Sequence, residues 1–269
     1  MALEYCILAS GSSGNCLWVR GGGVEILIDR GLSARRIADR LAAVGRDLRD
    51  VQAVICTHGH GDHVAGAAVL ARRFGLDVHA TAGTLRHVRG DPPPDRLRPV
   101  DVRGRFRIGG LEIRLAPTPH DAVGSCSVVV DDGETSLGVC TDLGRSTETI
   151  RRHLEGVDGL VLEMNHDLRM LLEGPYPEVL KRRIHGDLGH LSNDQAAELL
   201  ADLLHPGLQH LSLAHLSEHN NLPELARDRA GAVLADAALS PVLAVASQHR
   251  PGEPVRLCTR RRGQLALPL

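Results

Sequence analysis

The chain has 269 residues with 43% hydrophobic content, which supplies a sizeable core and excludes a disordered or fibrous chain. The formal net charge is -2, so no overall positive field favours a nucleic-acid or membrane partner, and any polyanion contact must be local. Aromatic residues make up only 2% of the chain, which argues against a single-strand binder built on an aromatic platform.

The first predicted elements are short β-branched and apolar runs separated by glycine-rich turns. Predicted strands cover residues 5–9, 16–19, 24–28 and 51–56, with predicted helices at 34–44 and 64–74. After a mixed segment, further strands are predicted at 105–108, 111–115, 125–130 and 135–140. The later chain alternates between helices at 147–154, 177–184, 193–204 and 223–237 and strands at 159–162, 208–213, 242–246 and 254–258.

Strands in meanders, followed by strands that alternate with helices, predict a mixed α/β sandwich with helices outside two sheets. We expect residues 1–269 to form one domain, because the proline-rich patch 90–94 is too short to separate two cores. Six cysteines without a CxxC pair, and a start without signal-peptide features, predict a cytoplasmic protein with reduced thiols. No apolar run is long enough to suggest a membrane span.

The chain contains 15 histidines, a composition that indicates metal binding or acid-base catalysis. Segment 57–63 reads Thr-His-Gly-His-Gly-Asp-His, between a predicted strand and a predicted helix. If the segment leaves the strand extended, His58 and His60 point the same way, while Asp62 and His63 turn toward a second point. Imidazole and carboxylate together are the usual ligands of zinc and similar ions. The spacing therefore predicts two metals rather than one.

Three later residues share one context, because each comes after an apolar run. These are His120, Asp142 and His215. Side chains at strand ends can converge on one rim of a sandwich, where loops carry function on a rigid scaffold. We therefore expect these three residues to complete the site.

The ordered pattern His-X-His-X-Asp-His, then His120, Asp142 and His215, resembles the metallo-β-lactamase superfamily. This resemblance implies an αββα four-layer sandwich with two divalent metal ions, zinc or manganese, at the edge of its sheets. It also implies the ligand sets: His58, His60 and His120 for the first metal, Asp62, His63 and His215 for the second, and Asp142 as the bridge.

Short matches along the whole chain are similar to the YycJ/WalJ-type branch, a branch of single-domain DNA exonucleases. They cover residues 8–16, 27–29, 31–33, 141–144, 163–167, 174–177, 189–193 and 215–218. The chain departs from the usual pattern of this branch at three positions. Gly59 and Gly61 stand where Glu and Ser are usual, and Arg30 stands where a small residue is usual. The resemblance implies a 5'-3' exodeoxyribonuclease with a role in DNA repair.

Two divalent ions roughly 4 Å apart can present a bridging hydroxide to a phosphodiester and neutralise charge on its oxygens. For the proton that the leaving oxygen needs, we expect His190 as donor, because it lies just before a predicted helix N-terminus that attracts phosphate. The related RNA-processing branch has a similarly placed histidine. Glu163 is expected to orient His190, and His166 to bind phosphate or support the site. With Asp62, these are the catalytic candidates.

Substrate contacts are expected from three places. The opening loop offers Ser12, Ser13 and Asn15, although it also suits a plain turn between strands. The pair Arg182 and Arg183 lies close in sequence to His190 and suits phosphate. Helix-start residues Ser192 and Asn193 belong to a predicted capping box that also suits phosphate. Asp29 is expected to support the site by hydrogen bonding rather than to bind metal.

The second interpretation is a small-molecule hydrolase for thioesters or lactones, similar to glyoxalase II, with the same two metals. Fold alone does not decide between these chemistries. A glyoxalase-type enzyme usually carries a helical C-terminal domain, whereas the 54 residues after His215 end strand-like. The sequence therefore favours DNA as the substrate and indicates no oligomeric state.

Overall fold

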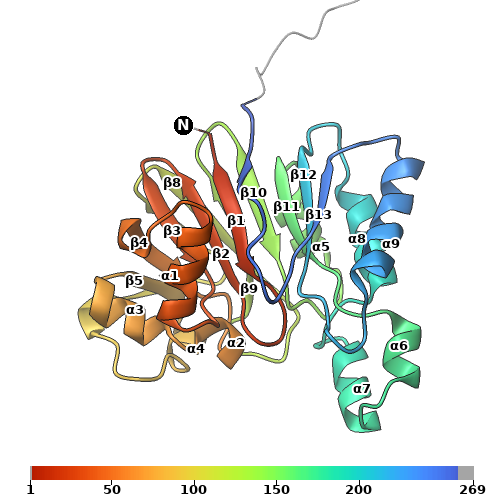
Figure 1. Cartoon of the computed structure of the whole chain (residues 1–269), viewed down its shortest axis with the longest axis horizontal. Helices are drawn as coiled ribbons and strands as arrows, with labels where there is room; N and C mark the ends of the chain where they lie inside the picture. Colours follow the sequence, from red (N-terminus) through yellow and green to blue (C-terminus); the bar gives the residue numbers. More distant parts are fainter. Residues whose placement is uncertain (1, 260–269) are drawn as a thin grey trace, which may run out of the picture.

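A computed structural model describes residues 2–259 of the chain. Two β-sheets pack face to face, and helices cover both outer faces (Figure 1). Within the described residues each sheet has seven strands, in the orders β14-β1-β2-β3-β4-β5-β6 and β13-β12-β11-β10-β9-β8-β7. The predicted αββα sandwich is therefore confirmed.

The strands of the first sheet are β1 (Glu4–Ala9), β2 (Cys16–Gly21), β3 (Val24–Ile28), β4 (Val51–Ile55), β5 (Asp77–Thr81), β6 (Leu97–Val100) and β14 (Val255–Arg256). Those of the second are β7 (Arg105–Ile108), β8 (Leu111–Pro117), β9 (Cys126–Asp131), β10 (Ser136–Cys140), β11 (Gly159–Glu163), β12 (His210–Ala214) and β13 (Val242–Val245). The helices are α1 (Ala34–Ala43), α2 (Gly61–Val64), α3 (Ala67–Phe74), α4 (Ala82–Leu85), α5 (Glu148–Leu154), α6 (Leu168–Glu173), α7 (Glu178–His185), α8 (Asn193–Leu203) and α9 (Pro223–Asp236), with 3-10 turns at Leu48–Asp50 and Pro94–Arg96.

Alternation along the strands builds the layers, because successive side chains point to opposite faces of a sheet. On β1, Tyr5 and Ile7 pack between the two sheets, while Cys6 and Leu8 pack under the helices of the first sheet. A third cluster, with Leu162 as a member, lies beneath α5, α8 and α9. Three apolar layers thus hold four layers of backbone together.

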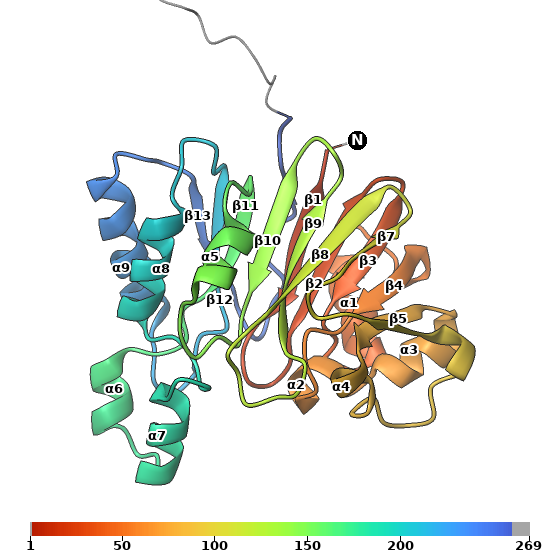
Figure 2. The ribbon, with the colours of Figure 1, turned by 180° about the vertical axis from the view of Figure 1, so that it is seen from behind.

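Strand direction brings many strand ends to one edge. Strands β3 to β6 are parallel, and so are β10 to β13. Strand β8 runs in the direction of β10, because both are antiparallel to β9. The helices α2, α6 and α7 project at this end of the molecule (Figures 1 and 2).

Several predicted elements need correction. Strands β5 and β6 lie in the segment that the sequence left unassigned; β6 carries Pro99 and is an edge strand, where proline is tolerated. The short helices α4 and α6 were also not predicted. The single helix predicted over 64–74 is wrong, because the chain breaks at Gly66 between α2 and α3.

All six cysteines are free thiols, and five of them are buried. Burial raises the pKa of Cys6 and of Cys140 to about 12, so these thiols are inert core side chains. Over residues 2–259, no helix has the length and apolar character needed to cross a membrane. The three consecutive arginines at 260–262 lie outside the described residues.

Candidate metal centre

The candidate ligands follow four strands at the same edge. After β4 come His58 and His60, with Asp62 and His63 on α2, and after β8 comes His120; Asp142 lies two positions beyond the end of β10, and His215 comes directly after β12. These seven side chains, which are far apart in sequence, form interlocking groups whose ligand atoms lie within 4.8 Å of one another.

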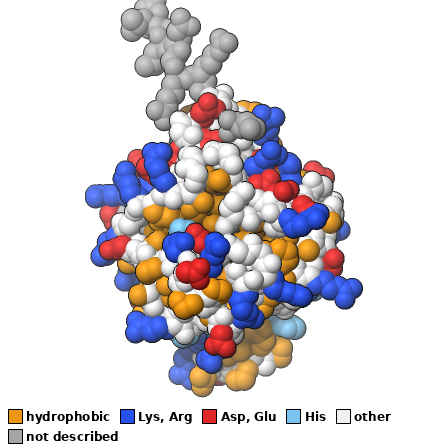
Figure 3. Space-filling model, turned by 90° about the vertical axis from the view of Figure 1, so that its left-hand side faces the viewer, with side chains coloured by type: hydrophobic (Ala, Val, Ile, Leu, Met, Phe, Trp, Pro, Cys, Tyr) orange, Lys and Arg blue, Asp and Glu red, His pale blue; other side chains and the backbone are white. Residues whose placement is uncertain are grey.

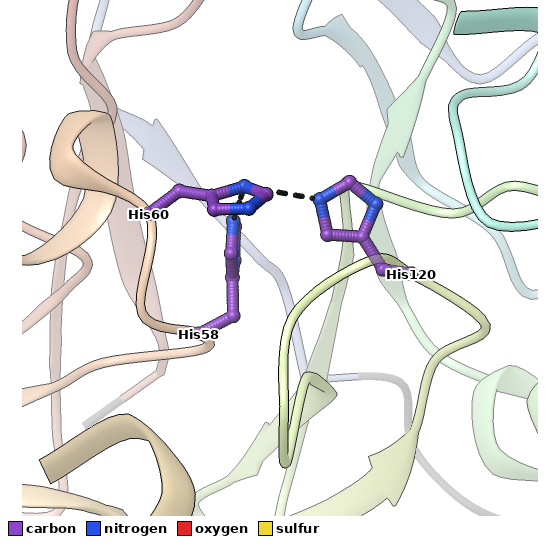
Figure 4. A group of neighbouring side chains, drawn as sticks. All are labelled: His58, His60 and His120. Atoms are coloured by element: carbon purple, nitrogen blue, oxygen red, sulfur yellow. Dashed lines mark hydrogen bonds between the residues drawn. The ribbon is translucent and has the colours of Figure 1, made fainter. Parts of the chain in front are cut away.

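The first group consists of three histidines (Figure 4). The two dashed lines join His60 Nδ1 to His58 Nε2 at 3.1 Å and to His120 Nε2 at 3.3 Å. His58 and His120 are buried, whereas His60 is partly exposed. Three nitrogens that face one point are a suitable donor set for one divalent ion.

The second group combines one carboxylate with two histidines. Asp62 Oδ2 lies 3.4 Å from His63 Nε2 and 3.8 Å from His215 Nε2. Asn15 supports this group, because its amide nitrogen lies 3.3 Å from Asp62 Oδ2 and 2.9 Å from His63 Nε2.

Asp142 lies between the two groups. Its Oδ1 is 3.9 Å from His58 Nε2 and 3.7 Å from His120 Nε2, and its Oδ2 is 3.3 Å from His63 Nε2. One carboxylate therefore contacts ligands of both groups, which is the arrangement needed to bridge two ions.

The ring orientation of two histidines is fixed by acceptors behind them. His63 Nδ1 donates to Asp29 Oδ2 at 2.8 Å, and His120 Nδ1 donates to the Gly189 carbonyl at 3.0 Å. Such partners select the tautomer that leaves Nε2 free for a metal. Asp29 thus supports the site by hydrogen bonding, as its sequence context predicted.

Backbone conformation also marks this edge. Asp29, Asp142 and His215 have φ values of 59°, 58° and 56°, a region that residues other than glycine rarely adopt. Such strain persists where surrounding contacts hold it, and it is typical of functional sites. Three strand ends thus turn sharply to direct their side chains inward.

Glu163, the last residue of β11, organises the centre from behind. The carboxylate is fully buried and accepts hydrogen bonds from His190 Nδ1 at 2.8 Å and His215 Nδ1 at 3.0 Å. The backbone N–H groups of three residues also donate to Glu163, each at 3.1 Å: Asp142, Leu143 and Leu191. Burial opposes its ionisation, yet His190 and His215 bring the pKa of Glu163 to about 2.

The histidines divide by protonation state in the metal-free protein. Burial, aided by the neighbouring His63, holds the pKa of His58 well below its usual value. Burial opposes protonation of His63 and His215 too, but the Asp142 carboxylate outweighs it, with further help from Asp29 at His63. The pKa of His63 is therefore raised strongly, and that of His215 to about 10. His63 and His215 are therefore protonated at neutral pH, and their positive charge faces the Asp142 carboxylate.

The residues present fit divalent metal ions. Asp142 Oδ2 and His215 Nε2 are buried without a hydrogen-bond partner, which is costly unless another group, such as a cation, meets them. Nitrogen and carboxylate oxygen donors are also the set that zinc and manganese take.

A cavity of about 280 Å³ opens over the ligand groups. Its wall includes Tyr176 and Arg183 from the segment around α7, together with Ser12. A larger hollow of about 740 Å³ lies elsewhere, next to Glu4 and Arg46, but these two charged groups already pair with each other at 2.7 Å. The smaller cavity is therefore the candidate active site.

Asp121 is a site residue that sequence reasoning missed. Its Oδ1 lies 3.2 Å from His60 Nε2, and its Oδ2 accepts from Arg183 Nε at 2.6 Å. Asp121 thus fixes the His60 ring so that Nδ1 faces the other ligands, and it ties Arg183 to the rim of the cavity. Its position directly after His120 was the available signal.

The expected substrate residues divide into three sets. Ser12 and Arg183 line the cavity, as does His190. Ser13 and Arg182 are exposed outside it. The side chains of the two helix-start residues already form hydrogen bonds within the protein. Ser192 forms the capping box with Gln195, and Asn193 exchanges hydrogen bonds with Asn221.

His166 is fully buried and does not line the cavity. Burial lowers its pKa to about 4, so the ring is neutral, and its Nε2 has no hydrogen-bond partner. The neighbouring Asp167 is the N-cap of α6 and accepts from the Met170 N–H at 2.8 Å.

The fold and the site together define a metallo-β-lactamase-type protein, and residues 25–215 match the family model described as Beta-lactamase superfamily domain. The chain belongs to this superfamily. Two similar relatives are exodeoxyribonuclease YycJ of Bacillus anthracis and exodeoxyribonuclease WalJ of Streptococcus pneumoniae. The first is 35% identical over 87% of this chain and 90% of the relative; the second is 34% identical over 84% and 86%.

Among solved structures, zinc-bound PqqB from Methylobacterium extorquens shares the fold. The TM-score is 0.69 at 18% identity, over 95% of this chain and 100% of that one. The resemblance inferred from the sequence motifs is thus confirmed, and the superfamily implies divalent metal ions at the centre described above.

Proposed function

We propose that this chain is a metal-dependent exodeoxyribonuclease that removes nucleotides from DNA in the 5'-3' direction. One observation carries the proposal: the Asp142 carboxylate lies between two complementary groups of metal ligands. The similarity to exodeoxyribonucleases over most of the chain supports DNA as the substrate.

The proposed ligands are His58, His60 and His120 for one ion, Asp62, His63 and His215 for the other, and Asp142 for both. Zinc is the expected metal, with manganese as the alternative. When bound, two such ions supply an activated water nucleophile and neutralise charge on the phosphoryl oxygens. Asp62 is ionised, because the neighbouring His215 and His63 outweigh the effect of burial and lower its pKa.

His190 is the proposed proton donor to the leaving oxygen. Its Nδ1 donates to Glu163 Oε1 at 2.8 Å, so Nε2 is left for the cavity that the ring lines. A general acid must reach the leaving group by hydrogen bonding, and an anchored ring with one free nitrogen meets this need. Glu163 acts as a positioning residue through His190 and His215.

Arg183 and Ser12 are the proposed substrate contacts at the rim, with Asn15 supporting Asp62 from the opening loop. Five other residues suggested by the sequence have at most indirect roles in catalysis and substrate binding: Ser13, Arg182, Ser192, Asn193 and His166. We further propose that residues 1–269 act as one domain, in the cytoplasm, in DNA repair.

The test is hydrolysis of end-labelled DNA by metal-loaded protein, with RNA and a thioester as competing substrates. We expect stepwise release of nucleotides from DNA, and loss of both turnover and bound metal in Asp142→Ala. Asp39→Ala is the matched control, because that carboxylate is 70% exposed on α1 and distant in sequence from the site. Faster thioester hydrolysis would favour the small-molecule alternative, and full activity of Asp142→Ala would exclude the proposed centre.

A further inference from the structure

One wall of the active-site cavity is apolar, although its floor consists of metal ligands. Tyr176, Leu180 and Ile184 line this wall, and all three come from α7 or the turn before it. Helix α7 projects at the same end of the molecule as α2, which carries Asp62 and His63 (Figures 1 and 2). An aromatic ring therefore faces the same space as the candidate catalytic groups.

The turn that carries Tyr176 is held firmly. Pro175 and Pro177 flank it, which restricts the backbone on both sides. Gly174 packs so closely against the carbonyl of Met170 that a Cβ there would sit 2.5 Å from the oxygen.

Helices α6 and α7 are also joined to each other. Lys181, the only lysine in the chain, is buried and donates to the Leu172 carbonyl at 2.6 Å. The aromatic ring is consequently presented by a rigid support, which reduces the entropy lost when a ligand binds.

We propose that Tyr176 stacks on the nucleobase of the terminal nucleotide of the substrate, an inference that rests on the proposed nuclease function. The scissile phosphate must lie over the ligand groups, so the attached nucleoside has to occupy the rest of the same cavity. A volume of about 280 Å³ admits a single chain end and is far too small for a duplex. Stacking is sequence-tolerant, because every base has a π-face.

The surroundings of Tyr176 suit an uncharged, flat group. Leu180 and Ile184 add apolar surface to the same wall, and the His219 ring lies 5.8 Å from the tyrosine ring in an edge-on arrangement. Arg183 is held at the rim by Asp121, where a backbone phosphate would pass. On the face that Figure 3 shows, basic and acidic side chains are interspersed without a continuous basic tract. That face therefore offers no broad basic surface.

The experiment compares two single-stranded oligonucleotides of one sequence, one with an intact terminal nucleotide and one with an abasic terminal residue. Hydrolysis of each is measured for the wild type, Tyr176→Ala, Tyr176→Phe and Val179→Ala. Val179 is the matched control, because it lies on α7 with 76% exposure and does not line the cavity. The rate on the abasic end reports on folding and metal loading of each variant.

We expect the wild type to prefer the intact end by about tenfold or more in kcat/KM. Tyr176→Ala should lose this preference while keeping its rate on the abasic end, and Tyr176→Phe and Val179→Ala should keep the preference. Equal rates of the wild type on both ends, an equal loss on both ends in Tyr176→Ala, or loss of the preference in Tyr176→Phe would each overturn the inference. No hydrolysis of either end by the wild type would overturn the proposed function, and this inference with it.

Discussion

Glu163 controls the centre at the scale of single residues, because one buried carboxylate orients two rings with different roles. His215 belongs to a ligand group and His190 is the proposed proton donor, yet both donate to the same Oε1. The remaining hydrogen bonds to Glu163 come from backbone N–H groups, so the carboxylate is also tied to the loops that carry Asp142 and His190.

Glu163→Gln tests this positioning role. An amide keeps the size but brings an NH₂ group against donors that need an acceptor, so we expect turnover and metal affinity to fall about 10- to 100-fold. Steady-state kinetics and metal titration measure the two effects. Glu148→Gln is the control, because that side chain is 58% exposed on α5. Activity of Glu163→Gln within twofold of the wild type would exclude the role.

The protonation of His63 and His215 leads to a prediction about pH. Both histidines have raised pKa values in the metal-free protein, so at neutral pH they carry protons that an incoming ion must displace. Raising the pH removes this competition, and metal affinity should therefore increase between about pH 6 and 9, by about tenfold per pH unit for each displaced proton. Calorimetric titration in buffers of different ionisation enthalpy measures the released protons. An affinity that is independent of pH would contradict these protonation states.

Several residue assignments could be made from sequence because the ligands follow apolar runs in a recognisable order. Asp121 was missed, since its roles depend on His60 and Arg183, which only folding brings near. The helix-start residue Asn193 was expected to contact substrate, but its amide is paired with Asn221, a partner 28 positions away. Pairings between distant polar side chains are not readable from local pattern.

At the scale of elements, the break between α2 and α3 shows how a buried side chain overrides helical periodicity. Arg30, only 1% exposed, lies against Gly66, where a Cβ would clash with its guanidinium. Burial lowers the pKa of Arg30 to about 10. Because the backbone N–H of Arg30 also donates to the His63 carbonyl at 2.7 Å, this packing helps to hold the ligand loop.

Helix α7 distinguishes two adjacent arginines that the sequence treats alike. Arg183 lines the cavity, whereas Arg182 is exposed and does not line it. Arg183→Ala should weaken DNA binding and reduce the slope of log affinity against log salt by about 1, while Arg182→Ala should leave both nearly unchanged. Binding of a labelled oligonucleotide over a range of salt concentrations measures this difference. Equal effects of the two substitutions would exclude a specific role for Arg183.

At the scale of the whole molecule, the centre exists because strands from two sheets end at one edge. The order of strands and helices along the chain predicted the sandwich, since strand and helix periodicities differ. Strands β5 and β6 were not predicted, because both are short and the edge strand β6 is largely exposed, so their sequence pattern is weak. The polar residues that follow β4, β8, β10 and β12 led us to expect that these strand ends converge. The distances between the side chains could be read only from the folded structure.

The central claim is that the seven ligands bind two divalent cations. Anomalous diffraction from crystals of the protein loaded with zinc or manganese tests it most directly. We predict two strong peaks, one among His58, His60 and His120 and one among Asp62, His63 and His215, with Asp142 in contact with both. No peak at these side chains, or a peak elsewhere in the molecule, would contradict the account.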